Sequence, residues 1–251
     1  MIKDMYIIGL KLKNNISDES NYALSLPVIK SLGQEQLVLN KNVTFFVGEN
    51  GTGKSTLLEA IAVNMGFNAE GGTRNFNFAS KETHSPLYQN LIVVKGVKRP
   101  RDGFFLRAES FYNVATEVDR LDEIGISSQR QFLDNYGGKS LHNQSHGESF
   151  MSLVLNRFKG NSLFILDEPE AALSPTKQLS LLVKINELEK QNCQFIIATH
   201  SPILLAYPNA DLYLLNENEI KLTAYKDTEH YAITKQFLNN TEKMLNYLFE
   251  E

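Results

Sequence analysis

The chain carries Gly48-Glu49-Asn50-Gly51-Thr52-Gly53-Lys54-Ser55 directly after the apolar run Val-Thr-Phe-Phe-Val at residues 43–47. The spacing is that of G-x-x-x-x-G-K-[ST], and apolar residues recurring at helical spacing predict a helix over residues 55–65. Glycines in such a turn let successive backbone N–H groups face inward at the positive end of a helix, where they bind phosphate. This stretch therefore predicts a nucleotide phosphate site within an α/β fold.

Two side chains of this loop have specific expected roles. Lys54 is expected to reach the β- and γ-phosphates and to take part in catalysis, and the hydroxyl of Ser55 is expected to ligate Mg²⁺. A chance glycine-rich turn is the alternative, which the strand before and the helix after disfavour. The nucleotide-binding residues predicted here are Gly48, Glu49, Asn50, Gly51, Thr52, Gly53, Lys54, Ser55 and Thr56.

Two further apolar runs, at residues 162–166 and 194–198, predict buried strands. Continuous apolar runs rather than alternation are typical of parallel strands covered on both faces. Helical spacing over residues 177–190 joins the two runs as a βαβ unit. We expect a mostly parallel core sheet with flanking helices.

The rest of the chain is expected to belong to the same single domain, residues 1–251. Residues 1–40 predict antiparallel strands beside the core. Residues 66–143 interrupt the β-α rhythm and predict an inserted lobe. The segment from Glu229 onward has helical spacing and is expected to pack back on the domain.

An acidic pair ends the apolar run at 162–166. A carboxylate at the tip of a parallel strand beside a phosphate loop can ligate Mg²⁺, and we expect this of Asp167. Glu168 comes next, points elsewhere and is expected to act as the base that orients or deprotonates the attacking water. A pair of solvated acids at a strand end is the alternative.

Two more elements follow strand ends or begin helices. His200 follows the run at 194–198 and could contact a γ-phosphate, although a lone loop histidine is more often a surface residue. Ser145, Gly147 and Glu148 precede a helical segment. They form either an ordinary N-cap or a second phosphate-binding helix end, with the Ser145 hydroxyl and the Gly147 N–H facing a γ-phosphate.

The order of these elements along the chain resembles that of the ABC-type ATPases, over all but the lobe and the two ends. The form Asp-Glu-Pro-Glu-Ala-Ala-Leu-Ser-Pro is similar to the soluble branch, which includes RecF-, SMC- and Rad50-like proteins and small stand-alone ATPases. The matching motifs are the signature sequence (Gln144 to Glu148, with His146 in place of glycine and Glu148 in place of glutamine), the Walker B pair (Asp167 and Glu168), the D-loop (Ala172 to Ser174) and the switch histidine (His200).

The resemblance implies an ATP-hydrolysing enzyme that uses Mg²⁺ and works as a homodimer. In this family two chains sandwich two ATP molecules head to tail, so Ser145, Gly147 and Glu148 would complete the partner's site. The family's metal- and water-contacting glutamine has no clear counterpart. Glu109 is our choice for that position and as a third metal-site residue, with Gln89 as the rival. Tyr22 is a candidate for stacking on adenine.

Composition sets the remaining expectations. The net charge of −4 argues against a surface that binds nucleic acid throughout, and no apolar run is long enough to span a membrane. One cysteine in the chain suits a reducing compartment, so we expect a cytoplasmic location without membrane insertion.

Three classes of biological role stay open. The first is an ATP-switched dimer in DNA repair or defence, with a separately encoded effector; its DNA contact would be the basic set Lys95, Lys98, Arg99, Arg101 and Arg107, which a solvated loop would also explain. The second is an ATPase subunit that energises a membrane transporter. The third is a slow ATP-dependent regulatory module.

Overall fold

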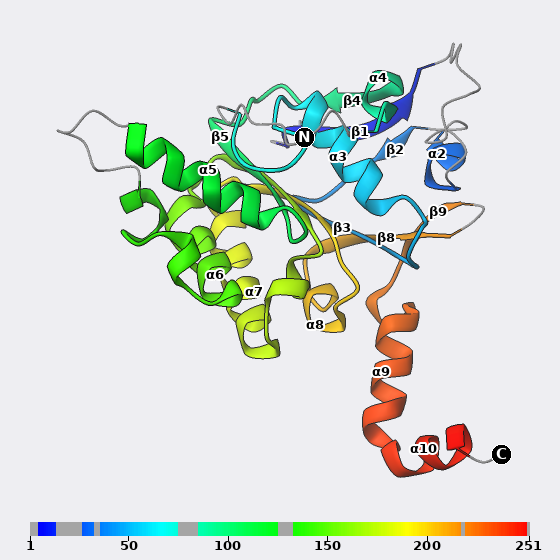
Figure 1. Ribbon diagram of the computed structural model, residues 1–251. Coiled ribbons are helices and arrows are strands. Elements are labelled where there is room, and N and C mark those ends of the chain that lie inside the picture. Colours follow the sequence, from blue (N-terminus) through cyan, green and yellow to red (C-terminus); the bar gives the residue numbers. More distant parts are fainter. Residues whose placement is uncertain are drawn as a thin grey trace.

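The computed structural model describes residues 5–13, 27–32, 36–74, 85–124, 133–216 and 219–249. Within these residues the largest sheet has the strand order β5-β6-β7-β3-β8-β9 (Figure 1). All neighbours in it pair in parallel except β8 and β9. The expected mostly parallel core sheet is confirmed. Its strands are β3 (Val43–Gly48), β5 (Asp102–Arg107), β6 (Ser162–Asp167), β7 (Gln194–Ala198), β8 (Ala210–Leu215) and β9 (Ile220–Thr223).

A second, antiparallel sheet lies beside the core, as expected for the N-terminal region. Its strand order is β2-β1-β4, with β1 at Ile7–Leu12, β2 at Leu37–Val38 and β4 at Leu91–Lys95. The buried side chain of Gln194 joins the two sheets: its Oε1 accepts from the N–H of Ile7 at 2.9 Å and its Nε2 donates to the Ile7 carbonyl at 2.7 Å. The amide thus satisfies backbone groups that would otherwise be buried without partners.

Helices cover both faces of the core sheet (Figure 1). Adjacent residues of β3 show why: Phe45 belongs to the apolar cluster under α5, α6 and α7, whereas Phe46 belongs to the cluster shared with α3 and β1. Alternating side chains of a strand point to opposite faces, so a strand buried on both sides reads as a continuous apolar run. The helices are α2 (Pro27–Leu32), α3 (Lys54–Asn64), α4 (Leu87–Asn90), α5 (Phe111–Ile124), α6 (His146–Arg157), α7 (Pro175–Glu189), α8 (Pro202–Leu205), α9 (Glu229–Asn239) and α10 (Thr241–Phe249).

The region expected as an inserted lobe, residues 66–143, is divided in the structure. Its apolar run at β4 pairs with β1, and β5 forms the edge of the core sheet beside β6. These two strands are therefore parts of the two sheets. The portion that stands apart from both sheets is α5 with the short 3-10 turns at Leu133–Tyr136 and Leu141–Asn143. Strand pairing over long sequence separation, which local pattern does not reveal, accounts for the difference.

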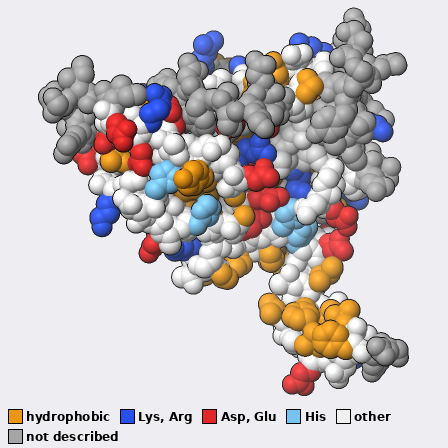
Figure 2. Space-filling view, in the orientation of Figure 1, with side chains coloured by type: hydrophobic (Ala, Val, Ile, Leu, Met, Phe, Trp, Pro, Cys, Tyr) orange, Lys and Arg blue, Asp and Glu red, His pale blue; other side chains and the backbone are white. Residues whose placement is uncertain are grey.

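The prediction that the C-terminal segment packs back on the domain is wrong for most of its length. Helices α9 and α10 project away from the body (Figure 1), and neither has a buried residue. Their apolar side chains form an exposed group on this arm, at the lower right of Figure 2. It includes Leu238 (70% exposed), Leu248 (68%) and Phe249 (75%). Among the described residues, no helix combines the length and the apolar character needed to cross a membrane.

Candidate functional site

The glycine-rich loop connects β3 to the first turn of α3, as its motif predicts. Gly53 is the N-cap residue of α3 and has φ 95° and ψ 14°, a left-handed conformation that residues with a Cβ rarely adopt. Lys54 lies buried under the loop, where its Nζ donates to the carbonyls of Gly48 at 2.7 Å and Glu49 at 2.8 Å. The ammonium group is thus held beneath the turn whose N–H groups would contact phosphate.

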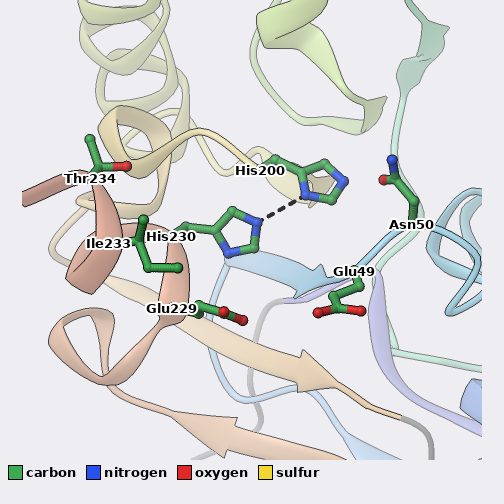
Figure 3. Close-up of a pocket in the computed structure, with 7 residues that line it drawn as sticks. All are labelled: Glu49, Asn50, His200, Glu229, His230, Ile233 and Thr234. Atoms are coloured by element: carbon green, nitrogen blue, oxygen red, sulfur yellow. Dashed lines mark hydrogen bonds between the residues drawn. The ribbon is translucent and has the colours of Figure 1, made fainter. Parts of the chain in front are cut away.

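His200 follows β7 and faces the same loop. It lines a pocket together with Glu49 and Asn50 of the loop and with His230 from α9 (Figure 3). Its Nε2 lies 3.5 Å from Oε1 of Glu168, and within the described part of the chain this buried nitrogen has no hydrogen-bond partner. Burial lowers the pKa of His200, and the charge of Lys54 acts in the same direction. The imidazole therefore directs one unsatisfied ring nitrogen toward the carboxylate of Glu168.

Glu168 has an unusual backbone conformation for its residue type. Its φ of 49° and ψ of 51° are left-handed, which costs about 1 kcal/mol for a residue with a Cβ. The strain is held by hydrogen bonds on both sides, from Glu168 N to the Ala198 carbonyl at 2.9 Å and from Ala171 N to the Glu168 carbonyl at 3.0 Å. Such strain is often stored at functional sites, where the surrounding structure imposes it.

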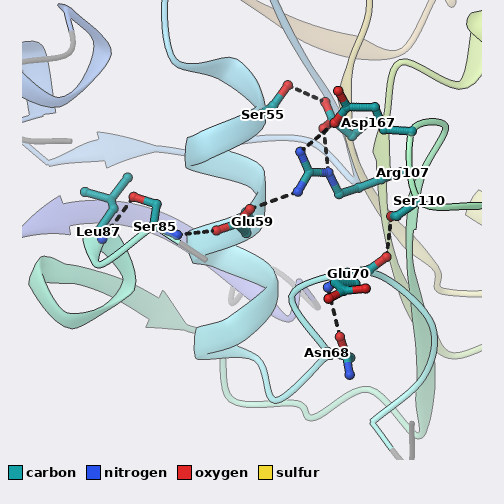
Figure 4. A network of polar contacts seen from close by, with 10 residues as sticks. Ser55, Glu59, Asn68, Glu70, Ser85, Leu87, Arg107, Ser110 and Asp167 are labelled. Atoms are coloured by element: carbon teal, nitrogen blue, oxygen red, sulfur yellow. Dashed lines mark hydrogen bonds and ion pairs between the residues drawn. The ribbon is translucent and has the colours of Figure 1, made fainter. Parts of the chain in front are cut away.

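Asp167 lies at the end of β6, between the loop and β5. The hydroxyl of Ser55 donates to its Oδ1 at 3.0 Å, and Nε of Arg107 lies 3.4 Å from its Oδ2 (Figure 4). Burial raises the pKa of Asp167 to about 6, although the nearby Arg107 and the Ser55 hydroxyl oppose the rise. Arg107 also pairs with Glu59 of α3 at 2.9 Å. One guanidinium therefore offsets the charge of two buried carboxylates.

The two candidates for the glutamine-like position lie in different places. Glu109 follows β5, lines the pocket that contains Ser55 and Asp167, and pairs with Arg107 at 3.2 Å. Gln89 is in α4, next to the antiparallel sheet, and its side chain donates to Tyr88 at 3.2 Å. The geometry favours Glu109 over Gln89. Tyr22, the adenine candidate, lies outside the described residues.

The segment Ser145–Glu148 forms the exposed start of α6. Both the N–H and the hydroxyl of Ser145 donate to the Glu148 carboxylate, at 3.0 and 2.6 Å, so the N-cap interpretation accounts for these two side chains as they stand. A Cβ on Gly147 would lie 2.8 Å from the Ala172 carbonyl oxygen. Glycine at position 147 therefore allows the start of α6 to lie this close to Ala172. Among residues 145–148, His146 lines the pocket of Asp167 and Glu109.

The residues present suit a magnesium ion. Hydroxyl and carboxylate oxygens are the ligands that Mg²⁺ prefers, and it usually takes one or two of them from the protein. Ser55 and Asp167 supply such a pair, 112 residues apart in sequence and 3.0 Å apart between their oxygens. Across the described residues, no group of three or more His, Cys, Asp or Glu side chains is arranged to hold a metal, so a densely ligated site is absent there.

Sequence reasoning missed three contributors to this site. Arg107 belonged to the basic set expected to contact DNA, yet it is committed to Glu59, Asp167 and Glu109. Arg107 is paired with Asp167 in the register of β5 and β6. This pairing could have indicated the contact, but only if the two strands were already known to be neighbours. Glu170, which is partly buried, accepts from the backbone N–H of His200 at 2.6 Å. His230 comes from the segment that was expected only to be helical and to pack back on the domain.

Comparisons with known proteins bear on the family and the fold of the chain. The sequence profile of the family described as "AAA domain" matches residues 23–248. An uncharacterized ABC transporter ATP-binding protein of Haemophilus influenzae is 25% identical over 225 residues, covering 84% of each chain. Protein McbF of Escherichia coli is 24% identical over 211 residues, covering 82% of each. The structure of CbiO1 from Clostridium perfringens, part of the ABC transporter complex CbiONQ, superposes with a TM-score of 0.53 at 18% identity, covering 98% of this chain and 100% of that one. This last likeness supports the fold.

Proposed function

The chain belongs to the AAA domain family and is an ABC-type ATPase, and from this premise we propose that two copies close on two ATP molecules and separate after hydrolysis. The observation that carries the proposal is the convergence of Ser55, Asp167, Glu168 and His200 at one edge of the sheet. They come from three neighbouring strand ends, which is where α/β sheets bind ligands.

Each side chain has a task that its surroundings favour. Lys54 and the N–H groups of the loop bind the phosphates, since a buried ammonium at a helix N-terminus attracts anions. Glu168 orients and deprotonates the attacking water, and His200, 3.5 Å away, donates through Nε2 to the terminal phosphate. Preorganised donors of this kind stabilise the charge that develops during phosphoryl transfer.

Ser55 and Asp167 hold Mg²⁺ in this proposal. Bound Mg²⁺ would neutralise charge on the β- and γ-phosphates. The side chain of Glu109 is 85% exposed and lies at the rim of the same pocket, where its carboxylate adds negative charge near the ion. Arg107 keeps these acids together by pairing with both Asp167 and Glu109.

The second half of each site comes from the partner chain. Ser145, Gly147 and Glu148 form the start of α6, a 12-residue helix whose first residues are largely exposed. An exposed helix N-terminus favours an anion through its N–H groups and its dipole. In a two-fold, head-to-tail dimer this end of one chain would contact the γ-phosphate held by the loop of the other.

Mixing two inactive variants tests the shared site. Lys54→Ala removes the loop lysine, and Ser145→Arg places a bulky cation at the exposed helix start. A mixed dimer then contains one site built from two intact halves, so equimolar mixing should restore about a quarter of the wild-type rate. Each variant alone should stay inactive. A mixture as inactive as its components, while both variants remain folded by circular dichroism, would contradict the shared site.

We propose DNA as the macromolecule on which the cycle acts. Lys95, Lys98, Arg99 and Arg101 support this, because they are exposed on β4 and the connection that follows it. Cations so grouped bind phosphate backbones with strong salt dependence and without sequence preference. The basic set available to DNA is smaller than the sequence indicates, because Arg107 pairs with Glu59 and Asp167 in the catalytic pocket.

The alternative is an ATPase subunit that docks on a membrane-spanning partner. The name of the Haemophilus influenzae relative supports it. A cytoplasmic location suits both proposals. Measuring ATPase rates and binding with double-stranded DNA at low salt separates them. If DNA neither binds nor stimulates, and the triple variant Lys98→Gln, Arg99→Gln, Arg101→Gln matches the wild type, the DNA proposal is excluded and the transporter alternative remains.

A further inference from the structure

His230 contacts His200, the histidine that donates to the γ-phosphate in the proposed function. Its Nε2 lies 2.9 Å from Nδ1 of His200, with the two ring centroids 5.1 Å apart (Figure 3). His200 belongs to the loop after β7, whereas His230 belongs to the first turn of α9. The pair therefore joins the root of the C-terminal arm to the catalytic pocket.

Counting protons determines which ring donates. A hydrogen bond between Nδ1 of His200 and Nε2 of His230 contains one proton, so one nitrogen donates and the other accepts. A neutral imidazole has a single N–H. If His200 carried its proton on Nδ1, its Nε2 would have only a lone pair. That lone pair would face the negative charges of Glu168 and of the phosphate, which is unfavourable. With the proton on Nε2, His200 donates to these groups and Nδ1 must accept from His230.

We propose that His230 is a positioning residue: its Nε2–H donates to Nδ1 of His200 and holds that ring in the Nε2–H tautomer, oriented toward Glu168 and the terminal phosphate. This inference rests on the proposed function, in which His200 contacts the γ-phosphate. A hydrogen bond made by one ring nitrogen commonly determines the protonation of the other. A carbonyl or carboxylate in the position of His230 could only accept a hydrogen bond from Nδ1–H of His200. It would therefore select the opposite tautomer, whereas His230 can donate.

Other contacts agree with this role. Burial lowers the pKa of both imidazoles, and the charge of Lys54 acts in the same direction on each, so the neutral forms, for which tautomers matter, are favoured. The backbone of His200 is held independently, by Glu170. The helix that carries His230 is also anchored without it: the Thr228 side chain caps α9, and the Tyr225 hydroxyl donates to the Pro202 carbonyl at 2.9 Å. Replacing His230 should therefore change the tautomer without releasing the arm.

The direct test is nitrogen-15 NMR of the histidine rings in nucleotide-free, metal-free protein at about pH 8, above the ordinary histidine pKa. Wild-type His200 should show the Nε2–H pattern. His230→Phe keeps a ring without a donor and should shift His200 toward a tautomer mixture, whereas His230→Gln retains an N–H donor and should keep the Nε2–H form. A wild-type His200 protonated on Nδ1 would overturn the proposal, as would a tautomer that His230→Phe leaves unchanged.

Kinetics give the second readout. His230→Phe should lower kcat about fivefold to tenfold, the value of one hydrogen bond, with the KM for ATP nearly unchanged. His230→Gln should recover most of the rate. In a His200→Ala background, His230→Phe should cost nothing further; an equal loss there would overturn the positioning role.

Gln236→Ala is the control, because Gln236 is an exposed residue of the same helix and is not among the residues that line this pocket; its rate should equal that of the wild type. Failure of the proposed function can be told apart from failure of this inference. If His200→Ala retains full activity, the proposed role of His200 in hydrolysis is wrong. The NMR experiment still decides independently whether His230 determines the tautomer of His200.

Discussion

Arg107 lies beside Asp167 at the edge of the core sheet, with its Nε 3.4 Å from Oδ2, and the same guanidinium pairs with Glu59 at 2.9 Å. The side chains of Glu59 and Asp167 are only 11% and 6% exposed, so each would be costly to leave ionised without a partner. The site thus contains its own cation, placed by β5, next to the acid expected to bind Mg²⁺.

Removing this cation should destabilise the fold. Arg107→Gln leaves Glu59 and Asp167 buried without their partner, at a cost of about 3 kcal/mol in the free energy of unfolding measured with urea. Combining Arg107→Gln with Glu59→Gln should cost less than the sum of the two single changes, because the second removes the unpaired charge. Strictly additive costs would show that the pair is not energetically coupled.

The pKa of Asp167 predicts an inverted effect of pH. Its folded value of about 6 lies above the ordinary value, so the folded state keeps a proton that the unfolded state has lost between about pH 4 and 6. The penalty for ionising Asp167 therefore grows as pH rises through this window and is complete above it. In buffer with EDTA, Asp167→Asn should be more stable than the wild type by about 3 kcal/mol at about pH 8, at about 1.4 kcal/mol for each unit of the pKa rise. This advantage should disappear below about pH 4. A constant difference across this range would contradict the shift.

The left-handed backbone of Glu168 predicts an unusual ranking of substitutions. Glu168→Gly should be more stable than Glu168→Ala by about 1 kcal/mol, since glycine adopts φ 49° without strain. At Ser180, an exposed position of α7, the ranking should be the ordinary one, with alanine better than glycine by about 1 kcal/mol. Chemical denaturation of the four variants gives both comparisons. The same ranking at both positions would mean that Glu168 is not strained.

Hydrolysis and dimer lifetime are linked in the proposed cycle. Glu168→Gln removes the base but retains the shape of the side chain, so ATP should bind and persist. Gel filtration with saturating ATP and Mg²⁺ should show a dimer for Glu168→Gln and a monomer for Glu168→Gln combined with Lys54→Ala. A Glu168→Gln protein that remains monomeric with bound ATP would count heavily against the sandwich.

The C-terminal arm should be dispensable for folding. Helix α10 has no buried residue, so truncating the chain after residue 240 should change the free energy of unfolding by less than about 0.5 kcal/mol. Leu188→Ala, at a position 1% exposed in α7, should cost about 2–5 kcal/mol in the same assay. A loss of stability on truncation comparable to that of Leu188→Ala would mean that the arm packs against the body in solution.

Local signals account for what could be predicted. The strands at 43–47, 162–166 and 194–198 were predictable because burial on both faces demands continuous apolar runs, and α3 and α7 because their core-facing residues recur at helical spacing. The segment from Glu229 shows the limit of such signals. Its apolar spacing correctly predicted helices, but spacing shows that a helix has an apolar face and not what covers that face.

The sequence by itself determined the chemistry of the loop, since the glycines and lysine of residues 48–55 work through adjacent backbone and side-chain groups. It also determined the fold class, through the order of strands and helices. Tertiary structure alone decided which charges meet: Arg107 pairs with Asp167 instead of facing solvent, and His230 reaches His200. Those contacts depend on strand order and on the position of the first turn of α9. Residues that meet across a long sequence separation show no periodic pattern in the sequence, so local spacing does not reveal the contact.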